Sequence, residues 1–152
     1  METKLSYEYI RGLIDGEGSF TFSTNEYTNR FGETIRRRVP AFILSMHERD
    51  TDLIRMVRDT MGLKNKIYFR KERRMSEGYI SGRQAILIVR EFGNLKNIVI
   101  PFFYKRLRGY KRRQFEEWIE AIGNDPGISD LFRLLYKLHA TGFYDRNPKF
   151  LD

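Results

Sequence analysis

Two carboxylates stand close together in a glycine-rich segment that follows a helical pattern. The apolar spacing before Asp15 predicts a helix that ends near that residue, and Gly16 and Gly18 favour its end. The C-terminal end of a helix already carries partial negative charge, so it disfavours Asp15 and Glu17 unless a cation lies beside them. Carboxylate and carbonyl oxygens are ligands that Mg²⁺ prefers, and Mg²⁺ supports phosphodiester hydrolysis. Taken alone, the segment also fits two solvated acids in a glycine turn.

A further glycine, Gly12, lies inside the predicted helix. Glycine in an exposed helix costs about 1 kcal/mol relative to alanine. Its presence therefore indicates a close approach by another backbone at this point.

Positive charge is in excess and is clustered along the chain. Lys and Arg number 28 against 20 Asp and Glu, which gives a net charge of +8. Such an excess favours a polyanionic partner, although charge alone also fits a basic protein without one. Basic clusters with interleaved aromatic residues favour nucleic acid, and they lie at residues 36–38, 70–74 and 105–113.

The composition excludes several other classes of protein. The absence of cysteine excludes disulfides, thiolate zinc sites and thiol nucleophiles, and it fits a reducing compartment. No run approaches the roughly 18 apolar residues of a membrane helix, and the charged N-terminus is not a secretory signal. We therefore expect an intracellular protein that is not secreted and does not associate with a membrane.

The periodicity of apolar residues predicts the elements that must position the carboxylates. Phe20 and Phe22 alternate with polar, uncharged residues, which is typical of a strand with one buried face. The predicted order is αββαββα followed by C-terminal helices, an α+β fold in one domain of residues 1–152. Its core spans about 5–140 and an irregular tail spans 141–152. The predicted helices lie at about 6–15, 53–61, 114–122 and 128–138, with a short helix before Pro101, and the strands at 18–28, 35–46, 66–74 and 79–89.

Residues 12–18, GLIDGEG, resemble the motif of the LAGLIDADG homing endonucleases at seven consecutive positions, and a strand follows as that family requires. The resemblance extends to residues 42–50, 100–103 and 107–111, and so covers most of residues 5–120. It implies that family's αββαββα fold, in which a saddle-shaped antiparallel sheet lies in the major groove of DNA.

The resemblance also implies an activity and its partners. These are metal-dependent, site-specific cleavage of a long, roughly palindromic duplex, with one phosphodiester hydrolysed per strand. Mg²⁺ is the expected cofactor; Mn²⁺ is expected to substitute for it, and Ca²⁺ to bind without supporting cleavage. A single motif implies a homodimer, in which the motif helices pack along a face that comprises Tyr9, Gly12, Leu13 and Gly16.

Individual roles follow from the resemblance by position. Glu17 matches the metal-binding acid, the Gly16 carbonyl a supporting ligand, and Lys111 a basic residue near the scissile group. Asp15 matches the first acid of the motif, for which a structural role is favoured over a catalytic one. Met46 stands where the family often has glutamine. The neighbouring His47 is a candidate catalytic residue, with a surface or helix-start role as the alternative.

The resemblance turns the polar face of the first strand towards DNA, in agreement with the alternation, and this face comprises Ser19, Thr21, Ser23, Asn25 and Tyr27. Groove contacts are expected from Arg37, Lys66, Tyr68, Arg70, Tyr79 and Arg83. Phosphate contacts or solvated charges are expected at Arg36, Arg38, Arg73, Arg74, Arg106 and Arg112. The core is expected to include Phe20, Phe22, Phe42, Leu44, Ile67 and Phe69.

Two other functions compete with cleavage. A non-cleaving member of this fold would serve as an RNA-splicing maturase or a transcription factor, but it has no need of Glu17 at a negative helix end. A basic protein that binds nucleic acid without sequence preference would rely on charge, whereas the first strand presents polar, uncharged side chains.

Overall fold

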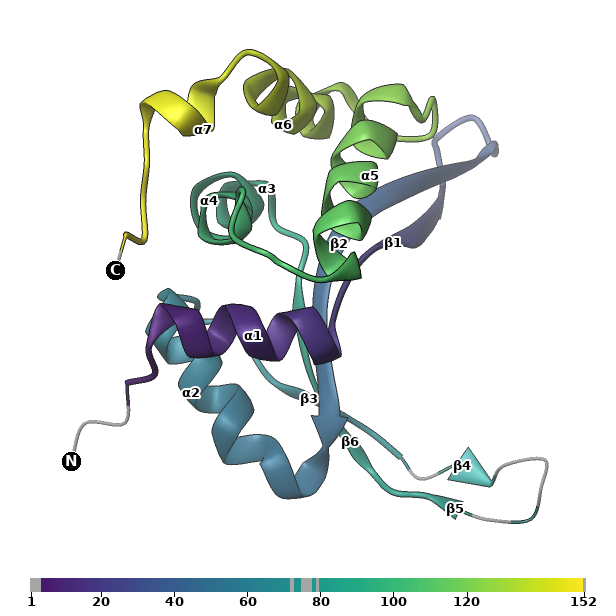
Figure 1. Cartoon of the computed structure of the whole chain (residues 1–152). Coiled ribbons are helices and arrows are strands. Elements are labelled where there is room, and N and C mark those ends of the chain that lie inside the picture. Colours follow the sequence, from purple (N-terminus) through teal and green to yellow (C-terminus); the bar gives the residue numbers. More distant parts are fainter. Residues whose placement is uncertain (1–3, 72, 75–77, 79, 152) are drawn as a thin grey trace.

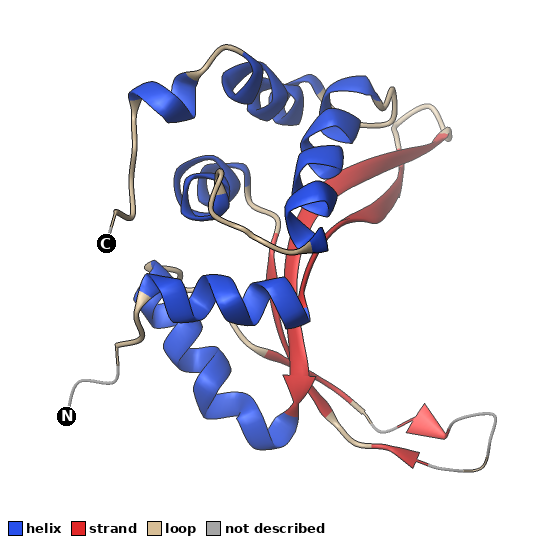
Figure 2. Cartoon of the chain, in the orientation of Figure 1, coloured by secondary structure: helices blue, strands red, loops and turns tan. Residues whose placement is uncertain are grey.

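The computed structural model describes residues 4–71, 73–74, 78 and 80–151. Four antiparallel strands form one sheet in the order β1-β2-β6-β3, and β4 and β5 form a separate two-stranded sheet. The helices gather on one side of the larger sheet (Figures 1 and 2). This is the mixed architecture of helices and an antiparallel sheet that the sequence predicts. No helix in the described ranges is long and apolar enough to cross a membrane.

The elements follow one another in the predicted order, with short irregular turns between them. η1 is a 3₁₀ turn, and η2 is a π-helical turn that joins α3 to α4. The bounds are α1 Tyr7–Glu17, β1 Gly18–Thr28, β2 Thr34–His47, η1 Glu48–Asp50, α2 Thr51–Met61, β3 Tyr68–Arg70, β4 Arg73–Arg74, β5 Ile80–Ser81, β6 Gln84–Val89, α3 Phe92–Asn94, η2 Leu95–Val99, α4 Ile100–Phe103, α5 Tyr110–Asn124, α6 Asp130–Ala140 and α7 Phe143–Arg146.

Aromatic packing joins the first strand to the helices. The rings of Phe20 and Phe42, which are register partners on β1 and β2, lie 5.4 Å apart. Phe20 also packs against Phe103 of α4 and against Phe115 and Trp118 of α5, at 5.0 to 5.7 Å. Because Phe20 is three residues from the end of α1, this cluster fixes the start of β1 against the helical layer.

The tail and the third and fourth strands differ from the sequence-based expectation. Residues 143–146 of the tail form α7. The strand expected at 79–89 is interrupted at Gly82, where a Cβ would lie 2.3 Å from Nε2 of His47. Phe69, expected in the core, is 41% exposed, and the Arg83 guanidinium lies 4.6 Å from its ring. These contacts depend on the tertiary fold, so the local pattern does not reveal them.

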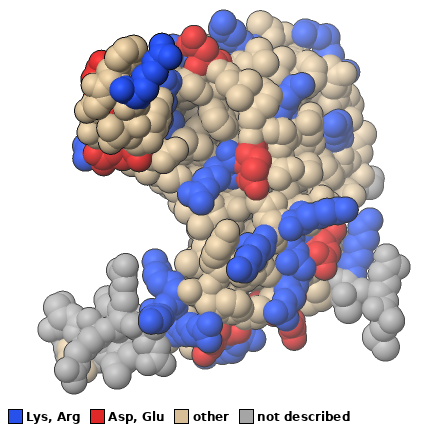
Figure 3. All heavy atoms as spheres, turned by 180° about the vertical axis from the view of Figure 1, so that it is seen from behind, with Lys and Arg blue, Asp and Glu red and all other residues tan. Residues whose placement is uncertain are grey.

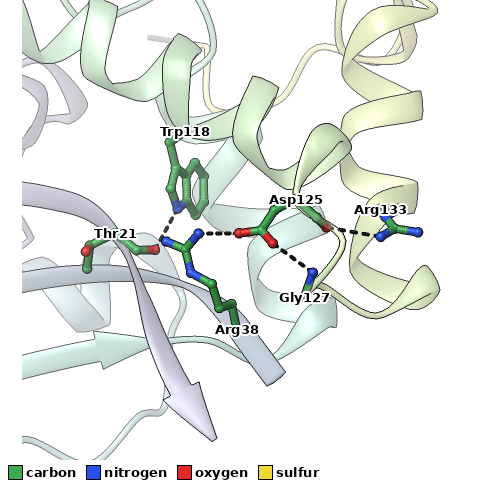
Figure 4. Close-up of polar contacts among 6 residues, drawn as sticks. All are labelled: Thr21, Arg38, Trp118, Asp125, Gly127 and Arg133. Atoms are coloured by element: carbon green, nitrogen blue, oxygen red, sulfur yellow. Dashed lines mark hydrogen bonds and ion pairs between the residues drawn. The ribbon is translucent and has the colours of Figure 1, made fainter. Parts of the chain in front are cut away.

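The turn between α5 and α6 is attached to the edge of β2 (Figure 4). The backbone N–H of Arg38 donates to the Gly127 carbonyl at 3.0 Å, and its guanidinium pairs with the Asp125 carboxylate. Asp125 also accepts from the Gly127 N–H at 2.7 Å. Nearby, the Trp118 indole donates to the Thr21 carbonyl at 2.8 Å, so that α5 is also bonded to β1. Arg38 is thus engaged on the helical side of the hairpin.

Candidate nucleic-acid interface and cleavage site

Glu17 lies at the junction where α1 ends and β1 begins. The Gly18 N–H donates to the Ile14 carbonyl, which closes the last turn of the helix. A Cβ at Gly18 would lie 2.5 Å from Cγ2 of Ile14 and 3.0 Å from its carbonyl oxygen, so this close turn needs glycine. Glu17 is exposed, and it forms no hydrogen bond or ion pair with the rest of the described chain. The carboxylate is therefore free to bind a ligand from outside the chain.

Lys111 reaches the same junction from the first turn of α5. Its Nζ donates to the Gly18 carbonyl at 2.5 Å, so the ammonium is held one residue from Glu17 along the chain. The side chain is half-buried, which limits the positions that it can adopt. The fold thereby brings together Glu17 and Lys111, which are 94 positions apart in the sequence.

Asp15 connects the end of α1 to the start of α5. Its carboxylate accepts from the Arg108 N–H at 3.1 Å and from the Gly109 N–H at 3.2 Å. These bonds explain why α5 begins at Tyr110, four residues before the periodicity indicated. Asp15 therefore holds the segment that positions Lys111, and its oxygens are already occupied.

His47 is positioned by backbone contacts at the end of β2. Its Nδ1 accepts from the Arg49 N–H at 3.1 Å and so caps η1, while the ring packs against Gly82. A catalytic role for His47 remains a prediction. Met46, on the opposite face of β2, packs partly against the core.

The strand register gathers the polar residues of β1 on one face of the sheet, together with Arg37, which pairs with Asn25 across β1 and β2. Asn25 and Tyr27 are exposed on this polar face. The Ser23 hydroxyl is buried and has no hydrogen-bond partner in the described ranges, so it is not presented outward. The full row on β1 is Ser19, Thr21, Ser23, Asn25 and Tyr27.

At the other end of the sheet, Tyr68 and Arg70 of β3 lie on the same face as Gln84, which the sequence analysis had not selected. Arg83 lies outside this group, because its guanidinium stacks on Phe69 and approaches Glu48 at 3.7 Å. Arg36 alternates with Arg37 and so occupies the opposite face, 3.6 Å from Glu26.

Two of the remaining expected contacts lie near the start of α5. Arg106 is exposed in the loop before α5, and Arg112 pairs with Glu116 at 3.3 Å. Arg73 and Arg74 belong to β4, but their side chains, like the whole of Tyr79, lie outside the described residues.

Several cations on or beside the polar face lack acidic partners. Within the described ranges, Arg37, Lys66, Arg70 and Arg90 form no ion pair. By contrast, several arginines of the helices pair with acids one turn away; examples are Arg55, Arg113 and Arg133. Figure 3 shows Lys and Arg spread over the rear of the molecule, whose outline is hollowed. This distribution leaves unneutralised positive charge on the polar face.

Arg90 is a candidate contact that the sequence analysis missed. It is exposed directly after β6 and lines a hollow of about 570 Å³ with Ser23, Asn25 and Val39. It also lines a smaller hollow of about 100 Å³ with Lys66 and Tyr68. Extending the alternation of β6 one residue past its end would have placed Arg90 on the polar face.

The geometry of the site agrees with the protein family that the sequence matches. The family model of the LAGLIDADG endonuclease matches residues 10–122. The chain belongs to the LAGLIDADG endonuclease family. The match includes the whole α1–β1 junction and Lys111.

Solved LAGLIDADG structures share this fold. The homing endonuclease I-TnaI has a TM-score of 0.60 at 21% identity, over 95% of this chain and 84% of that one. I-LtrWI, a LAGLIDADG homing endonuclease solved with its target DNA, has a TM-score of 0.58 at 26% identity, over 86% of this chain and 41% of its own. I-CpaMI, bound to uncleaved DNA, has a TM-score of 0.63 at 19% identity, over 95% and 44%. This chain thus spans less than half of the latter two. The comparison with curated proteins gave no match.

One side of the LAGLIDADG helix α1 is uncovered in the single chain. Tyr9 is 49% exposed, and a Cβ added at Gly12 or Gly16 would meet no atom within 4 Å. Leu13 lies on the same side and is half-buried. Helical spacing groups these four residues into one face, the glycine face, which a second helix could approach closely.

The donor set for a metal ion is incomplete within one chain. In the part of the chain that the structure describes, no group of three or more His, Asp or Glu side chains could hold a metal ion. At the junction, Glu17 offers a free carboxylate, and carbonyls of the last helical turn lack helical partners. These oxygen donors suit a hard divalent cation, provided that a second chain or a phosphate supplies further ligands.

Proposed function

We propose that this protein is a homodimeric endonuclease that cuts a long DNA duplex at a specific site, with one phosphodiester hydrolysed per strand. The observation that carries the proposal is the position of Glu17. It is exposed and unpaired at the end of α1, where the polar face begins and Lys111 is held. A protein that only bound DNA would gain nothing from a free carboxylate facing phosphates.

The glycine face of α1 supports the dimer. Two helices that pack through Gly12 and Gly16 approach closely, and their C-terminal ends then bring the two Glu17 carboxylates together near the twofold axis. The chain spans 41% and 44% of I-LtrWI and I-CpaMI, so two copies would approach the length of one such protein. A twofold dimer recognises a target that is roughly palindromic.

Glu17 and the Gly16 carbonyl would hold the divalent cation, with Mg²⁺ expected, Mn²⁺ able to substitute and Ca²⁺ expected to bind without cleavage. When bound, the cation supplies positive charge at the phosphate and favours ionisation of water. Lys111 adds a second positive charge against the negative charge that develops on the scissile group. Asp15 keeps Lys111 in place through the start of α5.

Sequence recognition is assigned to the polar face. Asn25 and Gln84 can read base edges through paired donors and acceptors, and Arg37 and Arg70 can bind guanine or phosphate. The exposed rings of Tyr27 and Tyr68 add contact area beside these groups. Both ends of the sheet thereby contribute to each half of the target.

Selection from a randomised duplex library with Mg²⁺ tests the proposal directly. We expect cleaved products to share one roughly palindromic sequence and to carry a break in each strand. Binding should weaken steeply with salt, because each neutralised phosphate contributes about −0.9 to the slope of log K against log[salt]. Recovery of random sequences, or enrichment by binding without any cut, would contradict the proposed function.

A further inference from the structure

The side of α1 opposite the glycine face contains a buried arginine. Arg11 is 4% exposed, and it lies beside Gly12 in the motif segment. Its Nε donates to the Phe102 carbonyl at 2.9 Å, and Nη2 donates to the Phe150 carbonyl at 2.9 Å. The guanidinium also lies 4.8 Å from the ring centre of Phe102 and 5.8 Å from that of Tyr7. Arg11 therefore joins α1 to α4 and to the C-terminal segment.

Phe150 is held in a conformation that a phenylalanine rarely adopts. Its φ of +56° lies in the left-handed region, which side chains with a Cβ disfavour. Such strain persists where surrounding contacts impose it. Here the ring packs 5.1 Å from Phe102 and 5.8 Å from Tyr7, while Arg11 binds the carbonyl. The segment 148–151 is thus anchored at one residue against the back of α1.

We propose that residues 148–151 form a strap that supports α1 from behind and fixes where Glu17 lies at the dimer axis. The inference rests on the proposed function. Arg11 is the fifth residue of the 11-residue helix that ends in Glu17, so the strap acts on the carboxylate through a rigid element. The strap lies beyond residue 122, where the family match ends. Arg11 and Phe150 are positioning residues, since neither contacts the proposed reacting groups.

The position of a rigid helix matters more to cleavage than to binding. A displacement of about 1 Å can lower a reaction rate about 100-fold, because the reacting groups must be aligned. DNA affinity comes from many contacts across the sheet, which the strap does not touch. Loss of the strap should therefore separate the two properties.

Phe150→Ala in the full chain tests this inference. On the library-selected duplex with Mg²⁺ and saturating protein, we expect single-turnover cleavage to fall about 10- to 100-fold. The dissociation constant for the duplex, measured with Ca²⁺, should stay within about threefold of the native value. Leu131→Ala is the matched control, because that side chain is 55% exposed on α6 and lies outside the strap. It should cleave as the native protein does.

A second measurement separates positioning from loss of fold. The chain has no cysteine, so Glu8→Cys places a single spin label on the exposed surface of each α1. We expect a narrow distance distribution between the two labels of the dimer, and a broader or shifted one when Phe150→Ala is added. Circular dichroism at the assay temperature gives the folded fraction by which each rate is corrected.

The proposed role of the strap would be overturned if Phe150→Ala left the label distances unchanged and its corrected cleavage rate equalled the native rate. Parallel losses of binding and cleavage would also overturn it. If the native protein dimerises and binds but never cuts, the proposed function fails. The label distances then still decide whether the strap positions α1.

Discussion

Arg90 and Asn25 line the same hollow, which Phe132 of α6 also borders, but they are held in different ways. Glu91 accepts from the Arg90 N–H at 2.9 Å and from the Asn65 side chain at 2.9 Å, so the backbone of Arg90 is fixed from behind. Its guanidinium has no acidic partner in the described ranges. A fixed backbone and an unpaired guanidinium favour bidentate recognition of guanine O6 and N7 by Arg90. Asn25 is exposed on β1 beside it and suits adenine.

Arg90→Ala and Asn25→Ala should each relax base preference at one position per half of the target. Each good bidentate contact discriminates by about 1–3 kcal/mol, so we expect roughly 5- to 150-fold loss of preference at that position. Affinity for random DNA should change much less for Asn25→Ala, which removes no charge. Selection with each variant on the randomised library measures the effect.

Lys137→Ala provides the control for Arg90→Ala, because it removes one exposed cation from α6, away from the polar face. It should leave every base preference unchanged. If Arg90→Ala also retains the native preferences, Arg90 contributes only general charge.

The parts of the site formed by neighbouring residues could be predicted from the sequence, whereas contacts between distant residues could not. The segment 12–18 shows its chemistry in consecutive residues, so Glu17 and the glycine face could be predicted from it. The partners of Asp15, by contrast, are backbone groups 93 and 94 residues away. Occlusion of the Ser23 hydroxyl depends on its tertiary surroundings. Period-2 alternation cannot reveal such an effect.

At the scale of elements, the predictions hold where a segment has one clear periodicity. The alternation of β1 and β2 places Phe20 and Phe42 in the core, as expected. The strand expected at 79–89 departs from its pattern at Gly82, where His47 approaches closely. The start of α5 and the short helix α7 depend on contacts with distant segments in the same way.

Substitution of Asp125 tests how the α5–α6 turn is held on β2. The N–H of Gly127 is the main cause that lowers the pKa of this carboxyl below 3.8, and Arg38 contributes as well. A carboxylate with a lowered pKa stabilises the fold above its unfolded pKa, and this stability is lost as the pH falls through the folded value. Asp125→Asn should therefore lower the melting temperature at pH 7.

The difference between Asp125→Asn and the native protein should shrink as the pH falls from 3.8 through the lowered pKa of the folded carboxyl, because the unfolded chain takes up its proton first and the native carboxylate is protonated only at lower pH. Thermal denaturation followed by circular dichroism across this range measures it. Asp130→Asn is the control, since its carboxylate is 97% exposed in an ion pair within α6. A difference that does not depend on pH would show that the charge of Asp125 is not what holds the turn.

Under the proposed function, a single chain would be incomplete. The described residues include too few ligands for the proposed cation, the glycine face is uncovered, and the sheet offers one set of contacts to a duplex with two strands. A second copy resolves all three features at once. These features agree with the homodimer that we propose.

Gly12→Leu should raise the dimer dissociation constant at least about 100-fold, because a leucine side chain would occupy the space where the two helices approach. Sedimentation at micromolar concentration should show a native dimer and a variant monomer of 18.2 kDa. Gly93→Leu makes the same change at an exposed glycine with open space around it, and it should remain dimeric. A native monomer, or a Gly12→Leu variant that dimerises normally, would remove the glycine face from the interface.

We propose that Glu17 is the acid that holds the catalytic cation, and the substitution Glu17→Gln tests this role. This substitution keeps shape and hydrogen bonding but removes the charge. Binding and single-turnover cleavage are measured on the same selected duplex for the native protein, Glu17→Gln and Asp15→Asn. We expect Glu17→Gln to lose cleavage almost completely while binding survives or tightens without metal, since the loss of a carboxylate lessens repulsion of phosphate. The native protein should likewise bind without cutting when Ca²⁺ replaces Mg²⁺. Asp15→Asn should retain measurable cleavage. Cleavage by Glu17→Gln within a few-fold of the native rate, with Asp15→Asn inactive, would instead assign the cation to the carboxylate of Asp15.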